Sequence, residues 1–211
     1  MWTWSLNWGE VTPTIIIGSC PMNPEHLARI RIEAGASAVL SLQHDDCLKH
    51  WSIDFPGLVL AAQRSGMALA RHPIRDFDLE DMRRQLPGAI ALLAQQQLAG
   101  HRTYVHCTAG LGRAPLTVLG LLTLVEGLDP EQAIRLILAG RPGAVPAWEA
   151  YHGCVEDLAA RHRNHIEHRA YELYQSGVHN DPDADWAEAR AEVLRSELIR
   201  MSNDLPYKTN G

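Results

Sequence analysis

Short apolar runs alternate with helix-patterned segments from residue 15 to residue 126, and this alternation constrains the fold more than any other feature. Runs typical of buried strands lie at 15–17, 38–42, 67–74 and 103–106. Segments with helical apolar spacing lie at 24–34, 55–65, 80–99 and 113–126, followed by 130–139 and 147–163. Strands that alternate with helices usually pair in parallel. We therefore predict an α/β fold, with a central, mostly parallel sheet flanked by helices.

Composition and charge narrow the class of protein. Of the 211 residues, 46% are apolar, which is enough to bury a core in one α/β domain with a small appendage. The net charge of −6 gives no overall attraction to nucleic acid or to an anionic membrane, and we expect neither as a partner. Residues 1–10 lack the pattern of a signal peptide, and the four cysteines are widely spaced without a CxxC pair. We expect a cytoplasmic protein without disulfides or structural zinc.

The character of the sequence changes after residue 163. Apolar residues at 170–174 and 186–201 have amphipathic helical spacing, a polar loop is expected at 176–185, and residues 202–211 are expected to form a loose tail. We therefore predict one domain at 1–163 and a small helical extension at 164–211 that is available to a protein partner. His162, His165 and His168 share one helix face, but no cysteine or carboxylate pattern accompanies them, and we predict no metal site.

A glycine-containing loop follows the apolar run at 103–106 and opens the helix at 113. A loop that leads into a helix N-terminus directs several backbone N–H groups into one concavity, which together with the helix dipole binds anions. The glycines allow the backbone to curl without steric clashes. The sequence therefore predicts a phosphate-binding loop formed by Thr108, Ala109, Gly110, Leu111, Gly112 and Arg113.

Cys107 and Arg113 add reactive chemistry to this loop. The surrounding N–H donors favour the thiolate form of Cys107, and the planar guanidinium of Arg113 can hold two phosphate oxygens. A buried structural cysteine and a surface arginine are the ordinary alternatives. The combined pattern between a strand and a helix instead predicts a nucleophile that forms a phosphocysteine, without a metal or cofactor. We expect His106 to hold the loop through a backbone hydrogen bond rather than to act as a base.

Cleavage of a phosphate ester also requires a proton donor for the leaving group. Asp76 follows the run at 67–74, at the sheet edge where such folds bind ligands, and we predict that it is the general acid. Asp78 is the main competitor, although it is also placed to cap the following helix. Glu80 and Asp81 also compete for this role. The alternative for Asp76 is a turn residue paired with Arg75.

The loop residues resemble the Cys-x5-Arg signature of the protein tyrosine phosphatases, including the dual-specificity branch. The sequence around Asp76 and the run from Tyr104 to Pro115 resemble the plant starch-excess glucan phosphatases and laforin, and the similarity spans about residues 5–160. It implies a dual-specificity phosphatase catalytic domain at 1–163. The residues around Tyr171, Gly177 and Trp186 resemble a small bacterial helical domain of unknown function.

The resemblance implies a phosphorylated glucan, similar to glycogen or starch, or a phosphosugar as the substrate. Leu111 is apolar where phosphoinositide phosphatases of this class carry lysine. Aromatic rings can stack on sugars, and the resemblance places five residues in the substrate cleft: Phe77, Trp51, His50, Trp8 and Trp148. Ordinary core packing is the alternative for each of them. Two alternatives remain, a broad-specificity phosphatase of phosphotyrosine, phosphoserine and phosphothreonine proteins, and a non-catalytic phosphate-binding scaffold.

Overall fold

Four parallel strands form the centre of the sheet in the computed structural model, which describes residues 3–177, 179 and 181–205. They are β2 (Ile15–Gly18), β3 (Ala38–Gln43), β4 (Ala68–Ile74) and β5 (Thr103–His106). Their order across the sheet is β2-β5-β3-β4, with β5 between β2 and β3. The predicted α/β class is confirmed, and each of the four predicted strands is present.

A fifth strand, β1 (Trp8–Thr12), was not predicted and lies antiparallel to β2 at the edge of the sheet. Only Val11 in this strand is buried, because one side of an edge strand faces solvent. The strand therefore lacks the run of buried residues that is typical of β2, β3 and β5.

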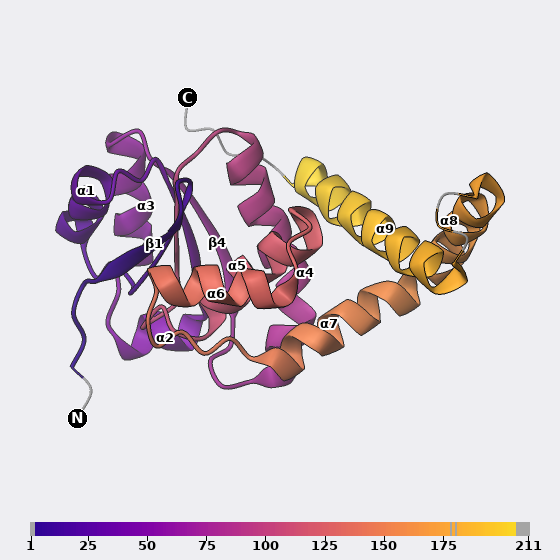
Figure 1. Ribbon diagram of the computed structural model, residues 1–211. Coiled ribbons are helices and arrows are strands. Elements are labelled where there is room, and N and C mark those ends of the chain that lie inside the picture. The colour runs from indigo at the N-terminus through magenta and orange to yellow at the C-terminus, as the bar shows by residue number, and fades with distance from the viewer. Residues whose placement is uncertain (1–2, 178, 180, 206–211) are drawn as a thin grey trace.

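Alternate residues of each strand contribute to two separate cores. Ile15, Ile17 and Val105 pack on one face, and Ile16 and Tyr104 pack on the other. Helices α1 (Pro24–Glu33) and α3 (Phe55–Arg64) cover the second face. The first face is covered by α4 (Leu79–Leu98), α5 (Arg113–Gly120), α6 (Pro130–Gly140) and α7 (Trp148–Arg161). Figure 1 shows α1 and α3 on one side of the sheet and these helices on the other.

Two predicted segments differ in detail. The helix expected over 113–126 is α-helical only to Gly120 and ends in a π-turn, η1 (Leu121–Val125), in which the Glu126 amide donates to the Leu121 carbonyl over 3.0 Å. The connection between the strand predicted at 38–42 and the helix predicted at 55–65 contains a short helix that was not predicted, α2 (Asp45–His50). The His44 side chain caps α2 by accepting from the Asp46 amide. No residue of α2 is buried, so it lacks the apolar spacing that predicts helices.

The C-terminal region is a hairpin of α8 (Arg163–Ser176) and α9 (Pro182–Asp204), which extends away from the sheet in Figure 1. The polar loop expected at 176–185 is shorter than predicted, because Asp181 caps α9 and Pro182 begins it. Of the tail expected at 202–211, residues 202–204 belong to α9 and residues 206–211 lie outside the described residues. Among the described residues, no helix is both long and apolar enough to cross a membrane.

The second half of α9 packs into the main core. Leu194 and Leu198 are buried in the cluster formed by α4, α5 and α7. The Gln95 side chain on α4 donates to the carbonyls of Ser202 and Leu205, over 2.9 and 2.8 Å. The first half of α9 forms a separate small cluster with α8 through Ala189, Ile166 and Leu173. The proposed boundary between 163 and 164 therefore separates two segments that share a core through α9.

This shared core predicts that α9 stabilises the whole chain. Leu198→Ala should lower the free energy of unfolding by about 2–5 kcal/mol, because Leu198 is 0% exposed. Leu138→Ala is the matched control, since Leu138 is 42% exposed, and should change this free energy by less than about 0.5 kcal/mol. Urea unfolding followed by tryptophan fluorescence measures both. Unchanged unfolding of Leu198→Ala would show that the extension does not support the sheet.

Candidate active site

The carboxyl ends of the parallel strands meet at one edge of the sheet, where a cavity of about 970 Å³ opens. β5 leads into Cys107, β3 is followed by His44, and β4 is followed by Arg75 and Asp76. Open α/β sheets bind ligands at this edge, where loops and helix N-termini converge. The cavity is lined by residues that follow these strand ends, by α2, by the start of the helix that begins at Leu79, and by the connection between α6 and α7: His44, Asp46, Cys47, His50, Trp51, Arg75, Asp76, Phe77, Asp78, Leu79, Met82, Cys107, Thr108, Ala109, Leu111, Gly112, Val145 and Ala147.

The loop from Cys107 to Gly112 is shaped by hydrogen bonds that turn its carbonyls outward. The Thr108 carbonyl accepts from the Cys20 amide over 3.0 Å, and the Leu111 carbonyl accepts from the Val145 amide over 2.7 Å. In a trans peptide the carbonyl and the following N–H point in opposite directions, so outward carbonyls leave inward N–H groups. These N–H groups and the N-terminus of α5 form the predicted anion-binding concavity.

Gly110 allows this loop to lie against β2. Its φ of 71° is in the left-handed region, which favours glycine. A side chain at this position would also place its Cβ only 2.3 Å from the Gly18 carbonyl oxygen. The loop therefore needs glycine at position 110 for both its conformation and its close contact with the end of β2.

Arg113 is fully buried beneath the loop, at 0% exposure. Its Nη1 donates to the Ile74 carbonyl over 2.8 Å, and its Nη2 donates to the Asp76 carboxylate over 2.7 Å. Burial opposes the guanidinium charge, but the nearby Cys107 sulfur and the Asp76 carboxylate outweigh it and raise the pKa of Arg113. Cys107 is 3% exposed and lines the cavity. The predicted nucleophile, phosphate clamp and acid therefore lie together.

Asp76 differs from the neighbouring carboxylates in its partner. It pairs with Arg113 rather than with Arg75, the partner expected if Asp76 were only a turn residue. Asp78 caps α4 by accepting from the Asp81 amide over 2.9 Å. Asp81 is buried and accepts from the Arg75 amide over 2.8 Å. Asp76 is therefore the carboxylate that contacts Arg113, the predicted phosphate clamp, while Asp78 and Asp81 support the turn around it.

His106 lies behind the loop in the expected manner. Its Nδ1 donates to the Cys107 carbonyl over 2.9 Å, and the side chain is buried. Burial lowers the pKa of His106 to about 4, which the hydrogen bond to the Cys107 carbonyl only partly offsets. His106 is therefore neutral at pH 7 and holds the first peptide of the loop.

Three of the five predicted aromatic residues line the cavity, namely Phe77, Trp51 and His50. Phe77 is 94% exposed, and its φ of 57° is in the left-handed region, which is strained for a bulky side chain. Trp8 does not line the cavity and instead packs edge-on against Tyr104 in the other core. Trp148 also lies outside the lining and stacks on His152. The structure therefore does not bring these two tryptophans into the cleft.

Sequence reasoning placed His50 and Trp51 in the cleft but missed the helix α2 and the contacts that Cys47 and Gln43 make with the loop. Cys47 on α2 lies 3.4 Å from the Arg113 Nη1, and Gln43 at the end of β3 donates to the Thr108 hydroxyl over 3.5 Å. The acidic residues after His44 and the basic residues at Lys49 and His50 are typical of a short helix and were an available signal. All four cysteines are unpaired.

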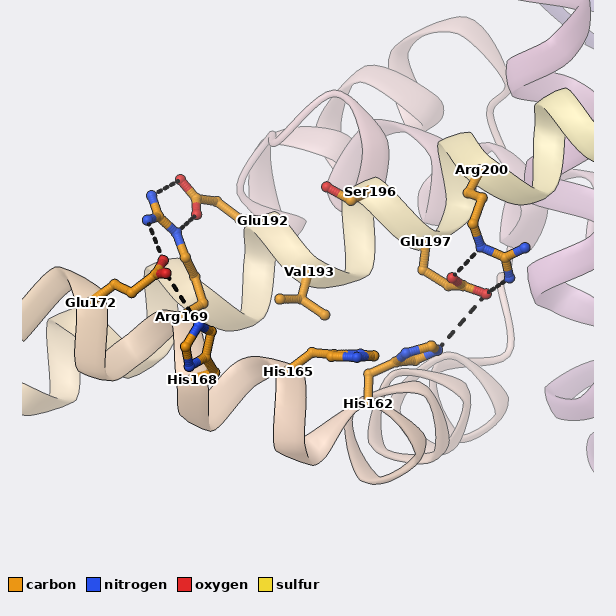
Figure 2. Close-up of a pocket in the computed structure, with 10 residues that line it drawn as sticks. All are labelled: His162, His165, His168, Arg169, Glu172, Glu192, Val193, Ser196, Glu197 and Arg200. Carbon is orange, nitrogen blue, oxygen red and sulfur yellow. Dashed lines mark hydrogen bonds and ion pairs between the residues drawn. The ribbon is translucent and has the colours of Figure 1, made fainter.

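A second cavity, of about 660 Å³, lies between α8 and α9 and is lined by the histidines considered for a metal site. Figure 2 shows His162, His165 and His168 along one side, with Glu192 and Glu197 of α9 opposite. His162 and Glu197 are 3.8 Å apart, and His168 pairs with Glu172 of its own helix over 3.2 Å. Within the described residues, no three histidine, cysteine or acidic side chains are grouped closely enough to hold a metal ion.

The sequence is similar to curated phosphatases. It is 32% identical over 155 residues to an amyloplastic phosphoglucan phosphatase of Castanea sativa, a match that covers 72% of this chain and 41% of the relative. It is 29% identical over 148 residues to laforin of Mus musculus, which covers 65% of this chain and 45% of laforin. The chain thus spans less than half the length of these relatives. No protein-family model matches it.

Solved structures share the fold. The crystal structure of PTPMT1 superposes with a TM-score of 0.55 and 18% identity, over 74% of this chain and 99% of that one. A mouse putative dual specificity phosphatase complexed with zinc tungstate superposes with a TM-score of 0.53 and 22% identity, over 73% of this chain and 89% of that one. The expected likeness of the fold to dual-specificity phosphatases is therefore confirmed.

The burial of neutral His106 predicts a pH-dependent stability. Because its pKa is lowered to about 4, the unfolded chain binds a proton that the folded chain does not bind between about pH 6.5 and pH 4. The contribution of neutral His106 to the free energy of unfolding is therefore fully present above about pH 6.5 and decreases as the pH falls toward 4. His106→Asn should reduce the slope of unfolding free energy against pH by up to about 1.4 kcal/mol per unit in this range.

Chemical denaturation at several pH values between 4 and 7.5 measures this slope. His165→Asn, at an exposed position on α8, is the matched control and should retain the wild-type slope. An unchanged slope in His106→Asn would show that protonation of His106 does not destabilise the fold.

Proposed function

From the dual-specificity phosphatase fold of this chain and its sequence similarity to phosphoglucan phosphatases, we propose that it is a metal-independent phosphatase that hydrolyses phosphomonoesters through a phosphocysteine at Cys107. The observation that carries this proposal is that Cys107, the buried Arg113 and Asp76 lie together around one predicted anion-binding loop. Each group has a role in displacement at phosphorus. A non-catalytic scaffold would need the loop and Arg113 but not the acid.

Phosphate binding uses the edge of Arg113 that carries Nε and Nη2. Its Nε is buried and has no hydrogen-bond acceptor among the described residues, while Nη2 is held by Asp76. Nε and Nη2 together form one edge of the planar guanidinium that can donate to two phosphate oxygens. A bound phosphoryl group satisfies Nε and takes over the contact that Asp76 makes with Nη2. The loop N–H groups bind the remaining oxygens.

Chemistry proceeds in two steps that balance. The Cys107 thiolate attacks phosphorus, the P–O bond to the leaving group breaks, and protonated Asp76 supplies the proton that the leaving oxygen requires. Water then attacks the phosphocysteine, Asp76 takes a proton from that water, and orthophosphate leaves as the S–P bond breaks. Arg113 and the inward N–H groups stabilise the charge on the phosphoryl oxygens in both steps.

We infer a phosphorylated glucan or phosphosugar as the substrate. Phe77, Trp51 and His50 present rings around the cavity, and rings of this kind stack on the apolar faces of sugars. The charged residues at the rim include Asp46 and the half-buried Asp78 as well as Arg75, so the rim lacks the positive excess that a polyphosphorylated headgroup would require. The curated relatives named as phosphoglucan phosphatases support the same substrate class.

Incubation of the purified chain with phosphorylated amylopectin or glycogen should release orthophosphate, and Cys107→Ser should abolish the release. A parallel panel contains an aryl phosphate, a phosphopeptide and a phosphoinositide. Release from the aryl phosphate without release from glucan would overturn the substrate but support the chemistry. Phosphopeptide turnover far above glucan turnover would favour a protein phosphatase, and no turnover of any substrate would overturn the function.

Asp76→Asn should reduce turnover of alkyl phosphates by about 100-fold or more, because an alkoxide leaves poorly without a proton. Turnover of an activated aryl phosphate should fall by less than about tenfold in rate. KM should not rise, since the substitution removes the carboxylate that occupies Arg113 Nη2. Steady-state kinetics on both substrates measures the difference.

Asp78→Asn is the matched control for this experiment. Asparagine caps helices as well as aspartate, so the turn at the start of α4 should persist and activity should stay near wild type. Equal losses on alkyl and aryl substrates in Asp76→Asn would contradict the acid assignment.

A further inference from the structure

Arg141 reaches the anion-binding loop from a distant part of the chain. It follows α6, and its side chain is only 9% exposed. The guanidinium Nη2 donates to the Ala109 carbonyl over 2.8 Å, and Nε donates to the Gly110 carbonyl over 3.2 Å. One planar side chain therefore holds two successive carbonyls of the loop.

These contacts complete the set that turns the loop carbonyls outward. The carbonyls of Cys107, Thr108, Leu111 and Gly112 accept from His106, Cys20, Val145 and Leu116. In the described part of the protein, the carbonyls of Ala109 and Gly110 have Arg141 as their donor. Because carbonyl and N–H are opposed across each peptide, Arg141 sets the direction of the N–H groups of Gly110 and Leu111.

The position of Arg141 is itself fixed by tight backbone packing. Its amide donates to the Ile137 carbonyl over 2.6 Å, at the end of α6. The preceding residue, Gly140, lies against β1 so closely that an added Cβ would be 1.9 Å from the Glu10 carbonyl oxygen. An added Cβ on Gly9 would be 1.6 Å from the Gly140 carbonyl oxygen. This pair of glycines lets α6 approach β1 and places Arg141 behind the loop.

We propose that Arg141 is a positioning residue, whose two-pronged contact with the Ala109 and Gly110 carbonyls orients the N–H groups of Gly110 and Leu111 toward the substrate phosphate. The inference rests on the proposed function for its catalytic consequence but not for phosphate binding itself. An arginine suits this role because its rigid fork donates in two fixed directions, whereas lysine presents a single ammonium. Without Arg141, the two peptides can rotate and turn their carbonyls toward the anion.

Burial and charge are consistent with this role. Burial lowers the pKa of Arg141, and the neighbouring Tyr104 and Cys107 partly offset that effect. The guanidinium remains charged at pH 7, because the unperturbed value is far higher. Its positive charge therefore lies on the outer side of the loop. The inner side of the same loop faces the Cys107 sulfur and the proposed phosphate position.

Binding of inorganic phosphate by isothermal titration calorimetry tests the proposal directly, since it does not depend on turnover. Arg141→Met should raise the Kd of phosphate by about tenfold or more, because hydrogen bonds to a charged group are lost. It should also lower kcat/KM for an aryl phosphate by a similar factor. Arg141→Lys retains a charge but cannot donate along both directions, so its Kd should lie between wild type and Arg141→Met.

Arg102→Met is the matched control. Arg102 likewise donates to two backbone carbonyls, those of Ala34 and Pro13, but it precedes β5 at the opposite end of the sheet from the cavity. Its loss should reduce stability while leaving phosphate affinity at the wild-type value. Thermal unfolding of each variant establishes that it is folded at the assay temperature.

Wild-type phosphate affinity in both Arg141 variants would overturn the proposal. If Arg141→Met does not fold, wild-type affinity in Arg141→Lys would by itself overturn it. An equal loss in Arg102→Met would also overturn it, since general destabilisation would then explain the effect. If the wild-type chain binds phosphate but hydrolyses no ester, the proposed function fails while the role of Arg141 is still tested by binding.

Discussion

The buried charge of Arg113 is the constraint on which the rest of the site depends. A guanidinium at 0% exposure is strongly unfavourable unless anions and carbonyls surround it, and its position at the N-terminus of α5 adds the positive end of a helix dipole. Asp76, the Ile74 carbonyl and the Cys107 sulfur provide that compensation. Loss of the Asp76 contact would leave the guanidinium without its carboxylate partner. In the proposed function, a phosphoryl group supplies the negative charge in its place.

The anion-binding loop is a product of the whole sheet rather than of its own sequence. Its carbonyls are held by donors from the end of β5, from the chain after β2, from Arg141 and from Val145. Parallel strands bring the first two to one edge, and α6 brings the others across the loop. The N–H groups can face one centre because the opposite side of every peptide is already bonded. Preorganisation of this kind means that the donors need no rearrangement when charge develops on phosphate.

The sequence was sufficient to predict the strands and helices that show a repeating pattern and the residues that form one local motif. It was not sufficient for features that depend on contacts between residues far apart in the chain. The central strands β2, β3 and β5 are short buried runs, β4 occupies the remaining strand position in the alternation with helices, and Cys107, Arg113 and the loop between them form one short motif, so periodicity and spacing were enough. β1 and α2 bury too few residues to show a period. Arg141 could not be connected with the loop, because its contacts span 31 and 32 residues. Trp8 and Trp148 were assigned to the cleft by resemblance; in the structure they contact Tyr104 and His152 and are not among the residues that line the cavity.

The ion pair between Asp76 and Arg113 connects substrate binding with the acid step of the proposed mechanism. In the ligand-free chain, Nη2 of Arg113 donates to the Asp76 carboxylate over 2.7 Å, so the proposed acid occupies one of the two donors that would bind the phosphoryl group. A phosphoryl group that takes the Nη2 contact separates Asp76 from Arg113 and leaves the carboxyl group available to the leaving oxygen. Phe77 supports the exchange, because its left-handed conformation keeps Asp76 in a short turn between Ile74 and the cap at Asp78. The acid is therefore released from its cation by the substrate that needs its proton.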